Sequence, residues 1–211
     1  MTKKRAEQIY HILLKMFPNA KAELDFTNPY ELLIATILSA QCTDVRVNKV
    51  TGVLFKKYPE PQDIANLSQE ELEKEIFTCG FYRNKAKNIL QTSKIIIEDY
   101  HGKVPESIEE LVKLPGVGKK TANVVASTAF GIPAIAVDTH VFRTSNRLGL
   151  VQAKNVVDTE KQLEKIWSRE CWSKGHHLLI FLGRRLCKSR KPLCEECDLS
   201  EHCKYYLKGQ G

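Results

Sequence analysis

Apolar residues recur at helical spacing along almost the whole chain, and this pattern restricts the fold more than any other feature of the sequence. Residues 3–17 predict an amphipathic helix that Pro18 ends. Further helices are predicted at residues 44–58, 83–100, 108–113, 119–130, 139–147, 155–167 and 174–186. Only residues 132–137, IPAIAV, resemble a strand, and one short strand cannot build a sheet. The sequence therefore predicts an all-α fold.

Residues that cap helices support this prediction. Asn28 followed by Pro29 is typical of a helix start, because asparagine caps the first turn and proline has no N–H to leave unpaired there. Two capping boxes are predicted to begin further helices: Ser68 with Glu71, and Ser107 with Glu110. Two glycines, Gly80 and Gly102, suit helix C-termini.

The composition is that of an ordinary globular protein with excess positive charge. Of the 211 residues, 43% are hydrophobic and 27% are charged, and the formal net charge is +7. Such a charge favours a polyanionic partner, nucleic acid before an anionic membrane, although many basic proteins bind neither. No apolar run is long enough to span a bilayer, and residues 1–17 lack the apolar core of a secretory signal. We therefore expect a cytoplasmic protein.

Four of the seven cysteines gather in a polar C-terminal stretch. Cys187, Cys194, Cys197 and Cys203 have the spacing C-x6-C-x2-C-x5-C. Disulfides are rare in the cytoplasm, and so many buried thiols would be unusual in a polar loop, so the spacing indicates a metal site. Zinc and an iron–sulfur cluster both accept four cysteines, and the spacing does not choose between them. The other cysteines are isolated, as small packing residues are: Cys42, Cys79 and Cys171.

Basic residues lie between the first two of these cysteines. Lys188, Arg190 and Lys191 would form a fixed positive surface for phosphates if a metal ordered the loop. A solvated run of charge explains the same three residues equally well.

The stretch LPGVGKKTANVV, residues 114–125, places two glycines and two lysines at a predicted helix start. It is not a nucleotide phosphate loop, because Lys113 stands where that motif needs a glycine. It is not a dinucleotide fingerprint either, because no strand precedes it. Gly116 and Gly118 would let backbone N–H groups approach an anion, which is a grip on a nucleic-acid backbone. A plain helical corner explains the glycines but not Lys119 and Lys120, which oppose the helix dipole.

Three separated motifs closely resemble the endonuclease III family of DNA glycosylases with lyase activity, within the helix–hairpin–helix superfamily. They are LPGVGKKTANVV, then AVDTHVFR, then the four-cysteine pattern; LLIATILSAQCTDVRVNK near the start extends the resemblance over essentially the whole chain. The resemblance implies two helical domains with DNA bound in the cleft between them. A six-helix domain of residues 22–132 would carry the hairpin, and residues 1–21 with 133–211 would carry a [4Fe-4S] cluster.

The resemblance also implies the roles of individual residues. The nucleophilic lysine of the family corresponds to Lys120 and its essential aspartate to Asp138. The side chains that fill the gap left by an extruded base correspond to Gln41 and to the neighbourhood of Phe81, where the family pattern has leucine. The hairpin and the cluster loop would bind double-stranded DNA that contains damaged bases, oxidised pyrimidines in particular, or abasic sites. We expect a monomer that is associated with the nucleoid through DNA.

The residues themselves are compatible with this chemistry. An amine nucleophile must be neutral, and Lys120 lies beside Lys119 at a helix N-terminus, a setting that disfavours a second positive charge. Its attack would leave a Schiff base that permits β-elimination. Asp138 could accept the lysine proton, but the sequence alone favours a role as the N-cap of the helix that follows it, and both roles can hold together.

Two other functions remain open from the sequence. An adenine glycosylase of the same superfamily would carry a catalytic glutamate at the position of Thr36 and would lack Lys120. A DNA-binding module without activity would use the hairpin and the metal loop only for grip, and the pair of Lys120 and Asp138 argues against it.

Overall fold

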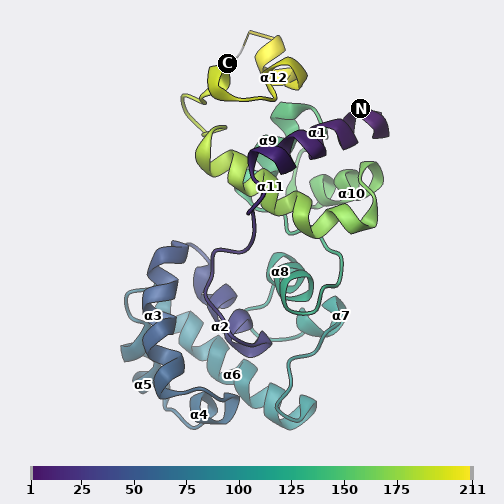
Figure 1. Ribbon diagram of the computed structural model, residues 1–211. Helices are drawn as coiled ribbons and strands as arrows, with labels where there is room; N and C mark the ends of the chain where they lie inside the picture. The colour runs from purple at the N-terminus through teal and green to yellow at the C-terminus, as the bar shows by residue number, and fades with distance from the viewer. Residues whose placement is uncertain (1, 210–211) are drawn as a thin grey trace. The chain divides into compact units, whose positions relative to one another are not determined.

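The protein is helical throughout the described chain, as the sequence predicts (Figure 1). A computed structural model describes residues 2–209 and contains no strand within them. The α-helices are α1 (Lys3–Met16), α2 (Pro29–Ser39), α3 (Asp44–Lys57), α4 (Pro61–Ala65), α5 (Gln69–Ile76), α6 (Tyr82–Tyr100), α7 (Ile108–Leu111), α8 (Lys119–Ala129), α9 (Thr139–Leu148), α10 (Val156–Ile166), α11 (Trp172–Arg185) and α12 (Lys204–Leu207). Short 3-10 turns lie at Arg169–Cys171, Cys194–Glu196 and Ser200–His202.

The chain divides into two compact units. The first, called here the hairpin unit, is residues 23–131 and contains α2 to α8. The second, called here the terminal unit, joins the residues up to 22 to those from 132 onward, so it contains α1 and α9 to α12.

Helix α2 is the centre of the hairpin unit. Nine of its residues, 30–38, are buried, so the helix is buried on every side instead of presenting one face to solvent. Helices α3, α6 and α8 pack against it, and α4 and α5 pack against α6. Two side chains of the 19-residue α6 also bond to neighbouring backbone: Lys85 to the carbonyls of Leu38 and Ala40, and Thr92 to that of Pro115.

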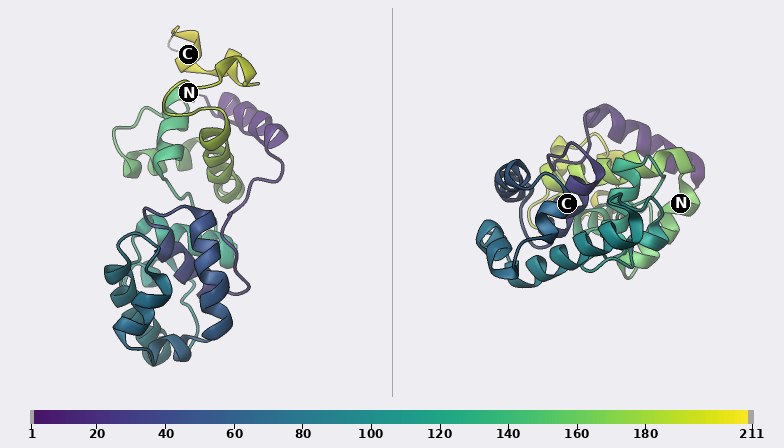
Figure 2. Two further views of the ribbon diagram at one scale, coloured as in Figure 1. Left: turned by 90° about the vertical axis from the view of Figure 1, so that its left-hand side faces the viewer. Right: turned by 90° about the horizontal axis from the view of Figure 1, so that it is seen from below.

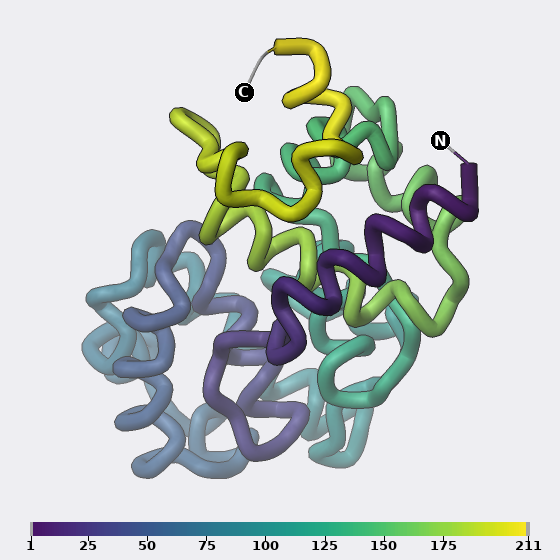
Figure 3. The backbone as a smooth tube through the Cα atoms, turned by 45° about the horizontal axis from the view of Figure 1, so that its top comes forward, coloured from purple at the N-terminus to yellow at the C-terminus, as the bar shows by residue number. Residues whose placement is uncertain are grey.

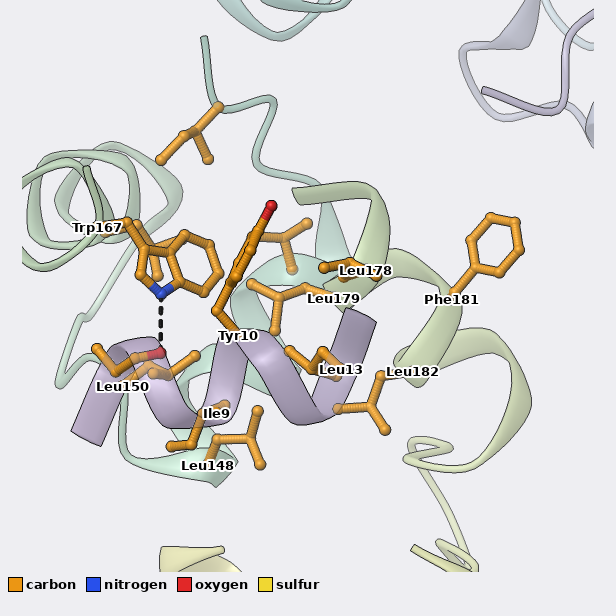
Figure 4. Close-up of a cluster of buried hydrophobic side chains, with 14 of the residues drawn as sticks. Ile9, Tyr10, Leu13, Leu148, Leu150, Trp167, Leu178, Leu179, Phe181 and Leu182 are labelled. Carbon is orange, nitrogen blue, oxygen red and sulfur yellow. Dashed lines mark hydrogen bonds between the residues drawn. The ribbon is translucent and has the colours of Figure 1, made fainter. Parts of the chain in front are cut away.

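The core of the terminal unit joins the first helix to the last long one. Helix α1 packs along α11, which also packs against α9, and both views of Figure 2 show the purple α1 beside the green α11. Figure 4 shows the apolar side chains between them, including Ile9, Leu13 and Leu179. The indole Nε1–H of Trp167 donates to the carbonyl of Ala6 at 3.2 Å, which ties the start of α1 to the end of α10.

Most predicted helix ends are confirmed. Asn28 accepts from the N–H of Glu31, and the Ser68 capping box is complete. Gly102 follows the C-cap residue of α6, is left-handed, and donates its N–H to the carbonyl of Ile96. The prediction for Gly80 is wrong, because α5 ends at Ile76.

One predicted cap is wrong in part. Ser107 accepts from the N–H of Glu110 at 3.2 Å, but the carboxylate of Glu110 accepts from Tyr100 and Lys113 instead of completing the box. Both donors bind the carboxylate more strongly than the backbone N–H of Ser107 would. Lys113 is a cation, and the phenol of Tyr100 donates over a short distance of 2.6 Å.

The C-terminal segment after α11 has little regular structure, and the yellow tube in Figure 3 follows its turns. Within residues 187–209, Leu199 is the only buried residue. Nothing in the described chain is helical, apolar and long enough at once to cross a bilayer.

Candidate functional site

The glycine turn before α8 is held by α6. Gly116 has a φ of +78°, and a Cβ added to it would lie 3.0 Å from the Cβ of Asn88 on α6. Thr92, one turn further along α6, donates its hydroxyl to the carbonyl of Pro115 at 2.9 Å. A side chain at residue 116 would therefore be strained and would push the turn away from α6. The first predicted glycine has a clear structural reason to be glycine.

Helix α8 begins with exposed positive charge. Gly118 is its N-cap residue and offers no side chain to cap the first N–H groups. A Cβ added to Gly118 meets nothing within 4 Å, so the space beside it is open. Lys119 and Lys120 follow, both exposed, and the first turn holds no acidic residue. Two lysines, the helix dipole and an open approach together favour an anion at this position.

Gln41 and Phe81 lie on neighbouring loops of the hairpin unit. Their φ angles are 53° and 57°, the left-handed region that few residues other than glycine adopt. Gln41 follows the end of α2, and Phe81 is the N-cap residue of α6 and is 64% exposed. A Cβ added to Gly80 would lie 3.5 Å from the carbonyl oxygen of Gln41. The structure thus brings together two loops that lie about 40 residues apart in the sequence.

Asp138 is the N-cap residue of α9 in the terminal unit, which confirms its predicted capping role. Its Oδ1 accepts from the N–H of Val141 at 2.8 Å, and the residue is half-buried. Its charge also acts on His177 of α11, a residue to which the sequence assigned no role. The pKa of His177 is lowered to about 4, first by burial and then by the charges of Lys174 and Arg184, whereas the charge of Asp138 opposes the shift.

All four clustered cysteines border one cavity. Cys187, Cys194, Cys197 and Cys203 line it together with apolar side chains such as Leu148 and Leu182, around about 360 Å³ of space that is partly open to solvent. Burial raises the pKa of the Cys197 thiol to about 11, and the charges of the other three cysteines act in the same direction.

The four thiols are free, and within residues 2–209 no group of three or more metal-binding side chains is gathered closely enough to hold an ion. All four thiols nevertheless border the same cavity. A multi-iron group would occupy the space between the sulfur atoms instead of drawing all four onto one ion. The donor set, four thiols around one apolar cavity, fits such a group.

Two arginines of α9 hold the loop that begins at Cys187, and neither was predicted from the sequence. Arg147 donates to the carbonyls of Lys188 and Ser189 at 2.7 and 3.0 Å, and to the Sγ of Cys187 at 3.5 Å. Arg143 donates to the carbonyl of Cys187 at 3.1 Å. The sequence does show that these arginines are four residues apart and so lie on one face of the helix. It does not show their partners, because these are backbone carbonyls about 40 residues away and any residue type can supply one.

The predicted basic side chains of that loop are all exposed. Lys188, Arg190 and Lys191 carry no salt bridge within the described residues, and Lys191 has a φ of 48°. Because Arg147 fixes the backbone at two of the loop's carbonyls, these charges stand on an ordered segment.

Residues 34–169 match the family described as HhH-GPD superfamily base excision DNA repair protein. The matched region includes the glycine turn, the paired lysines of α8 and Asp138. The chain belongs to the HhH-GPD superfamily. This match confirms the helix–hairpin–helix superfamily that the three motifs indicate.

Relatives within this HhH-GPD family are similar along nearly the whole chain. Endonuclease III of Bacillus subtilis is 56% identical over 190 residues, which cover 90% of this chain and 87% of the relative. Endonuclease III of Escherichia coli K12 is 45% identical over 205 residues, which cover 97% of each protein. A solved structure of a trapped covalent endonuclease III–DNA intermediate has a TM-score of 0.95 and 50% identity and covers 100% of both chains.

Thr36 bears on the other glycosylase considered from the sequence. It lies buried in α2, and its hydroxyl donates to the carbonyl of Leu32 at 2.7 Å. This HhH-GPD chain therefore has no carboxylate at that position, and the hydroxyl that replaces it is occupied within its own helix.

Proposed function

We propose that this HhH-GPD protein is a base excision repair DNA glycosylase that is also a lyase at abasic sites. It removes oxidised pyrimidines from double-stranded DNA and cleaves the strand 3′ to the abasic site by β-elimination. The observation that carries the proposal is Lys120, an exposed amine in the first turn of α8, directly after a turn suited to a nucleic-acid backbone. Full-length similarity to endonuclease III proteins, one of them trapped covalently on DNA, supports the same chemistry.

Lys120 is the proposed nucleophile. Its neutral Nζ attacks C1′ of the damaged nucleotide, and the base leaves with the electron pair of its bond to C1′. The nitrogen loses one proton, the bond between C1′ and the ring oxygen breaks as that oxygen gains a proton, and a protonated imine forms between Nζ and C1′. A proton then leaves C2′ and its electron pair moves towards the imine to give an enamine, which expels the phosphate oxygen from C3′ and restores the protonated imine. One amine thereby accounts for base release and strand cleavage.

Asp138 is the proposed acceptor of the lysine proton. Its Oδ1 is held by the N–H of Val141, so the direction of the carboxylate is fixed before substrate arrives. A carboxylate oriented in this way can take a proton and offset the positive charge that develops on the sugar. Capping α9 and accepting the proton are compatible roles, because the cap uses one oxygen.

Both units are proposed to bind DNA, as separate domains of one monomer. In the hairpin unit the N–H groups near Gly116 and Gly118, with Lys119, would hold the backbone phosphates. Gln41 and Phe81 would fill the gap left by the extruded base, since both are exposed on adjoining loops. In the terminal unit the exposed charges of the cysteine loop would contact phosphates: Lys188, Arg190 and Lys191.

The four cysteines of the cavity are proposed to hold a [4Fe-4S] cluster. When bound, the cluster would cross-link the C-terminal segment, which buries too little apolar surface to order itself. The protein would then be yellow-brown and contain iron and sulfide; zinc without iron, after growth with sufficient iron, would contradict the cluster. We propose that the enzyme works in the cytoplasm, on the DNA of the nucleoid.

Borohydride trapping on damaged duplex DNA tests the proposed function. Reduction of the imine would join Lys120 to C1′ permanently, so the wild type should give a covalent adduct. Lys120→Gln should abolish both the adduct and base release while leaving DNA affinity largely intact. Lys119→Gln is the matched control, because the neighbouring lysine has the same charge and exposure, and it should still give the adduct.

Each alternative result has a distinct meaning. An adduct from Lys120→Gln but none from Lys119→Gln would move the nucleophile by one residue. Adducts from both variants would place the nucleophile elsewhere. Tight binding by the wild type without any adduct would indicate a binding module or an enzyme without lyase activity.

A further inference from the structure

Lys85 is a buried charge that the proposed chemistry does not use. It lies in the first turns of α6 and is only 5% exposed. No carboxylate in residues 2–209 forms a salt bridge with it. Its Nζ instead donates to the carbonyls of Leu38 and Ala40, at 2.8 and 2.7 Å. Burying an ammonium without an anion is costly, and desolvation lowers the pKa of Lys85 accordingly.

The two carbonyls lie where the chain leaves α2. Ala40 is the C-cap residue of that helix, and the next residue is Gln41 with its φ of 53°. The carbonyl end of a helix carries partial negative charge, so a cation is favourable there. By bonding to the carbonyls of residues 38 and 40 together, the ammonium fixes the backbone immediately before Gln41. A non-glycine residue in the left-handed region is strained and persists only where its surroundings impose that conformation.

Lys85 is also connected to the second loop. Its backbone N–H donates to the carbonyl of Phe81 at 3.1 Å, in the first turn of α6. The residue before Phe81 is Gly80, whose added Cβ would lie 3.5 Å from the carbonyl oxygen of Gln41. One residue thus bonds through its side chain to the end of α2 and through its backbone to the residue that begins α6.

We propose that Lys85 is a positioning residue that holds Gln41 in the left-handed conformation from which it enters the gap left by an extruded base. The inference rests on the proposed function, because Gln41 can fill such a gap only if the protein extrudes a base from DNA. Lys85 touches neither DNA nor reacting atoms; it acts through Gln41. A purely structural lysine would instead stabilise the fold without any special relation to Gln41.

A double-mutant cycle on base release separates these two roles. The variants are Lys85→Met, Gln41→Ala and the double variant, measured under single-turnover conditions on a duplex with one oxidised pyrimidine. Each single change should slow base release on the order of 10- to 100-fold, because misplacing a positioning group by about 1 Å has effects of this size. The double variant should be no slower than the slower single variant, because Lys85 has nothing left to position once Gln41 is truncated.

Lys174→Met is the matched control. The Nζ of Lys174 also donates to two backbone carbonyls beyond a helix, those of Pro18 and Ala20 at 2.7 and 2.8 Å, but in the terminal unit. If Lys174→Met slows base release, the double variant with Gln41→Ala should be slowed by the product of the two single factors, because the two residues act independently. Thermal unfolding of every variant shows the fraction folded at the assay temperature. Lys85→Gln, which keeps N–H donors without charge, replaces Lys85→Met if the latter does not fold and should show the same coupling.

Two failures are distinguishable. If the wild type releases no base, the proposed function fails and the role of Lys85 fails with it. If the wild type releases base normally but the effects of Lys85 and Gln41 multiply as those of Lys174 do, only the positioning role is overturned.

Discussion

The two units position their functional residues by different means. In the hairpin unit, Lys120 stands on a helix start whose preceding turn is packed on α6, and the loop of Gln41 is held by a buried ammonium. In the terminal unit, Asp138 is oriented by one N–H, and the cysteine loop is held by arginines bonded to carbonyls.

We therefore expect the two units to respond differently to acid and to the loss of a bound metal. The hairpin-unit contacts that hold the turn before Lys120 and the loop of Gln41 are packing, the hydroxyl bond of Thr92 and the bonds of the Lys85 ammonium, and none of them involves a carboxylate or a bound metal. The terminal unit contains the half-buried His177 and, in residues 187–209, a segment with a single buried residue, Leu199. Acid and loss of a metal should therefore affect the terminal unit first.

The largest expected effect is that of Asp138 in the terminal unit, which should matter more for base release than for strand cleavage. Asp138→Asn should keep the cap of α9 while removing the proton acceptor, so base release should slow by about 10²–10⁴-fold. Strand cleavage at a preformed abasic site should slow much less, because the aldehyde there reacts with Lys120 directly. Rates on the two substrates, measured side by side, check this. Equal losses on both substrates would assign Asp138 a role in binding or folding instead.

The next effect concerns acid. Because the pKa of His177 is lowered to about 4 in the folded protein, from 6.5, the unfolded chain binds more protons between these values. The neutral side chain of His177 therefore makes its full contribution to the free energy of unfolding above pH 6.5, and this contribution is lost as the pH falls towards 4. The contribution that is lost amounts to about 3 kcal/mol. His177→Gln should remove most of this slope in denaturant unfolding measured from pH 7 to 4.5.

The exposed His11 of α1 supplies the control for that experiment. His11→Gln should leave the pH dependence of unfolding unchanged. A His177→Gln protein that keeps the wild-type slope would show that other groups cause the acid sensitivity and would weaken the contrast between the units.

Sequence reasoning succeeded where structure depends on neighbours along the chain. Helix positions and the caps at Asn28, Ser68 and Asp138 follow from residues within three or four positions, and all are confirmed. The five-residue α4 was missed because so short a helix has no apolar period to detect.

The predictions failed where partners are distant or compete. Lys85 bonds to the carbonyl of Leu38, 47 residues away, and Arg147 to that of Lys188, 41 residues away. Every residue has a backbone carbonyl, so the sequence does not show which one is the partner. The Ser107 box is incomplete because Tyr100 and Lys113 take the carboxylate of Glu110.

Removing one proposed metal ligand tests the dependence of the terminal unit on a cluster. Cys197→Ser should lose its iron and expose residues 187–207 to protease, while residues 23–131 remain resistant. If the loop's three basic side chains then no longer reach phosphates, the log–log salt slope of DNA binding should fall by about 2.7, since each phosphate contributes about 0.9. That change amounts to about 40-fold over a fourfold range of salt. Cys171→Ser, outside the cavity, should change neither; a Cys197→Ser protein with full iron would contradict the assignment.

The smallest effect comes from single charges of the same loop. If Lys188, Arg190 and Lys191 each contact one phosphate, changing any of them to glutamine should lower the salt slope by about 0.9, or about 3.5-fold in affinity over a fourfold range of salt. The loss should be alike for every DNA sequence, because phosphates carry no sequence information. Lys161→Gln, an exposed lysine of α10, should leave the slope unchanged. If all three loop variants keep the wild-type slope, the loop is an ordered but solvated surface, and the grip on DNA belongs to the hairpin unit alone.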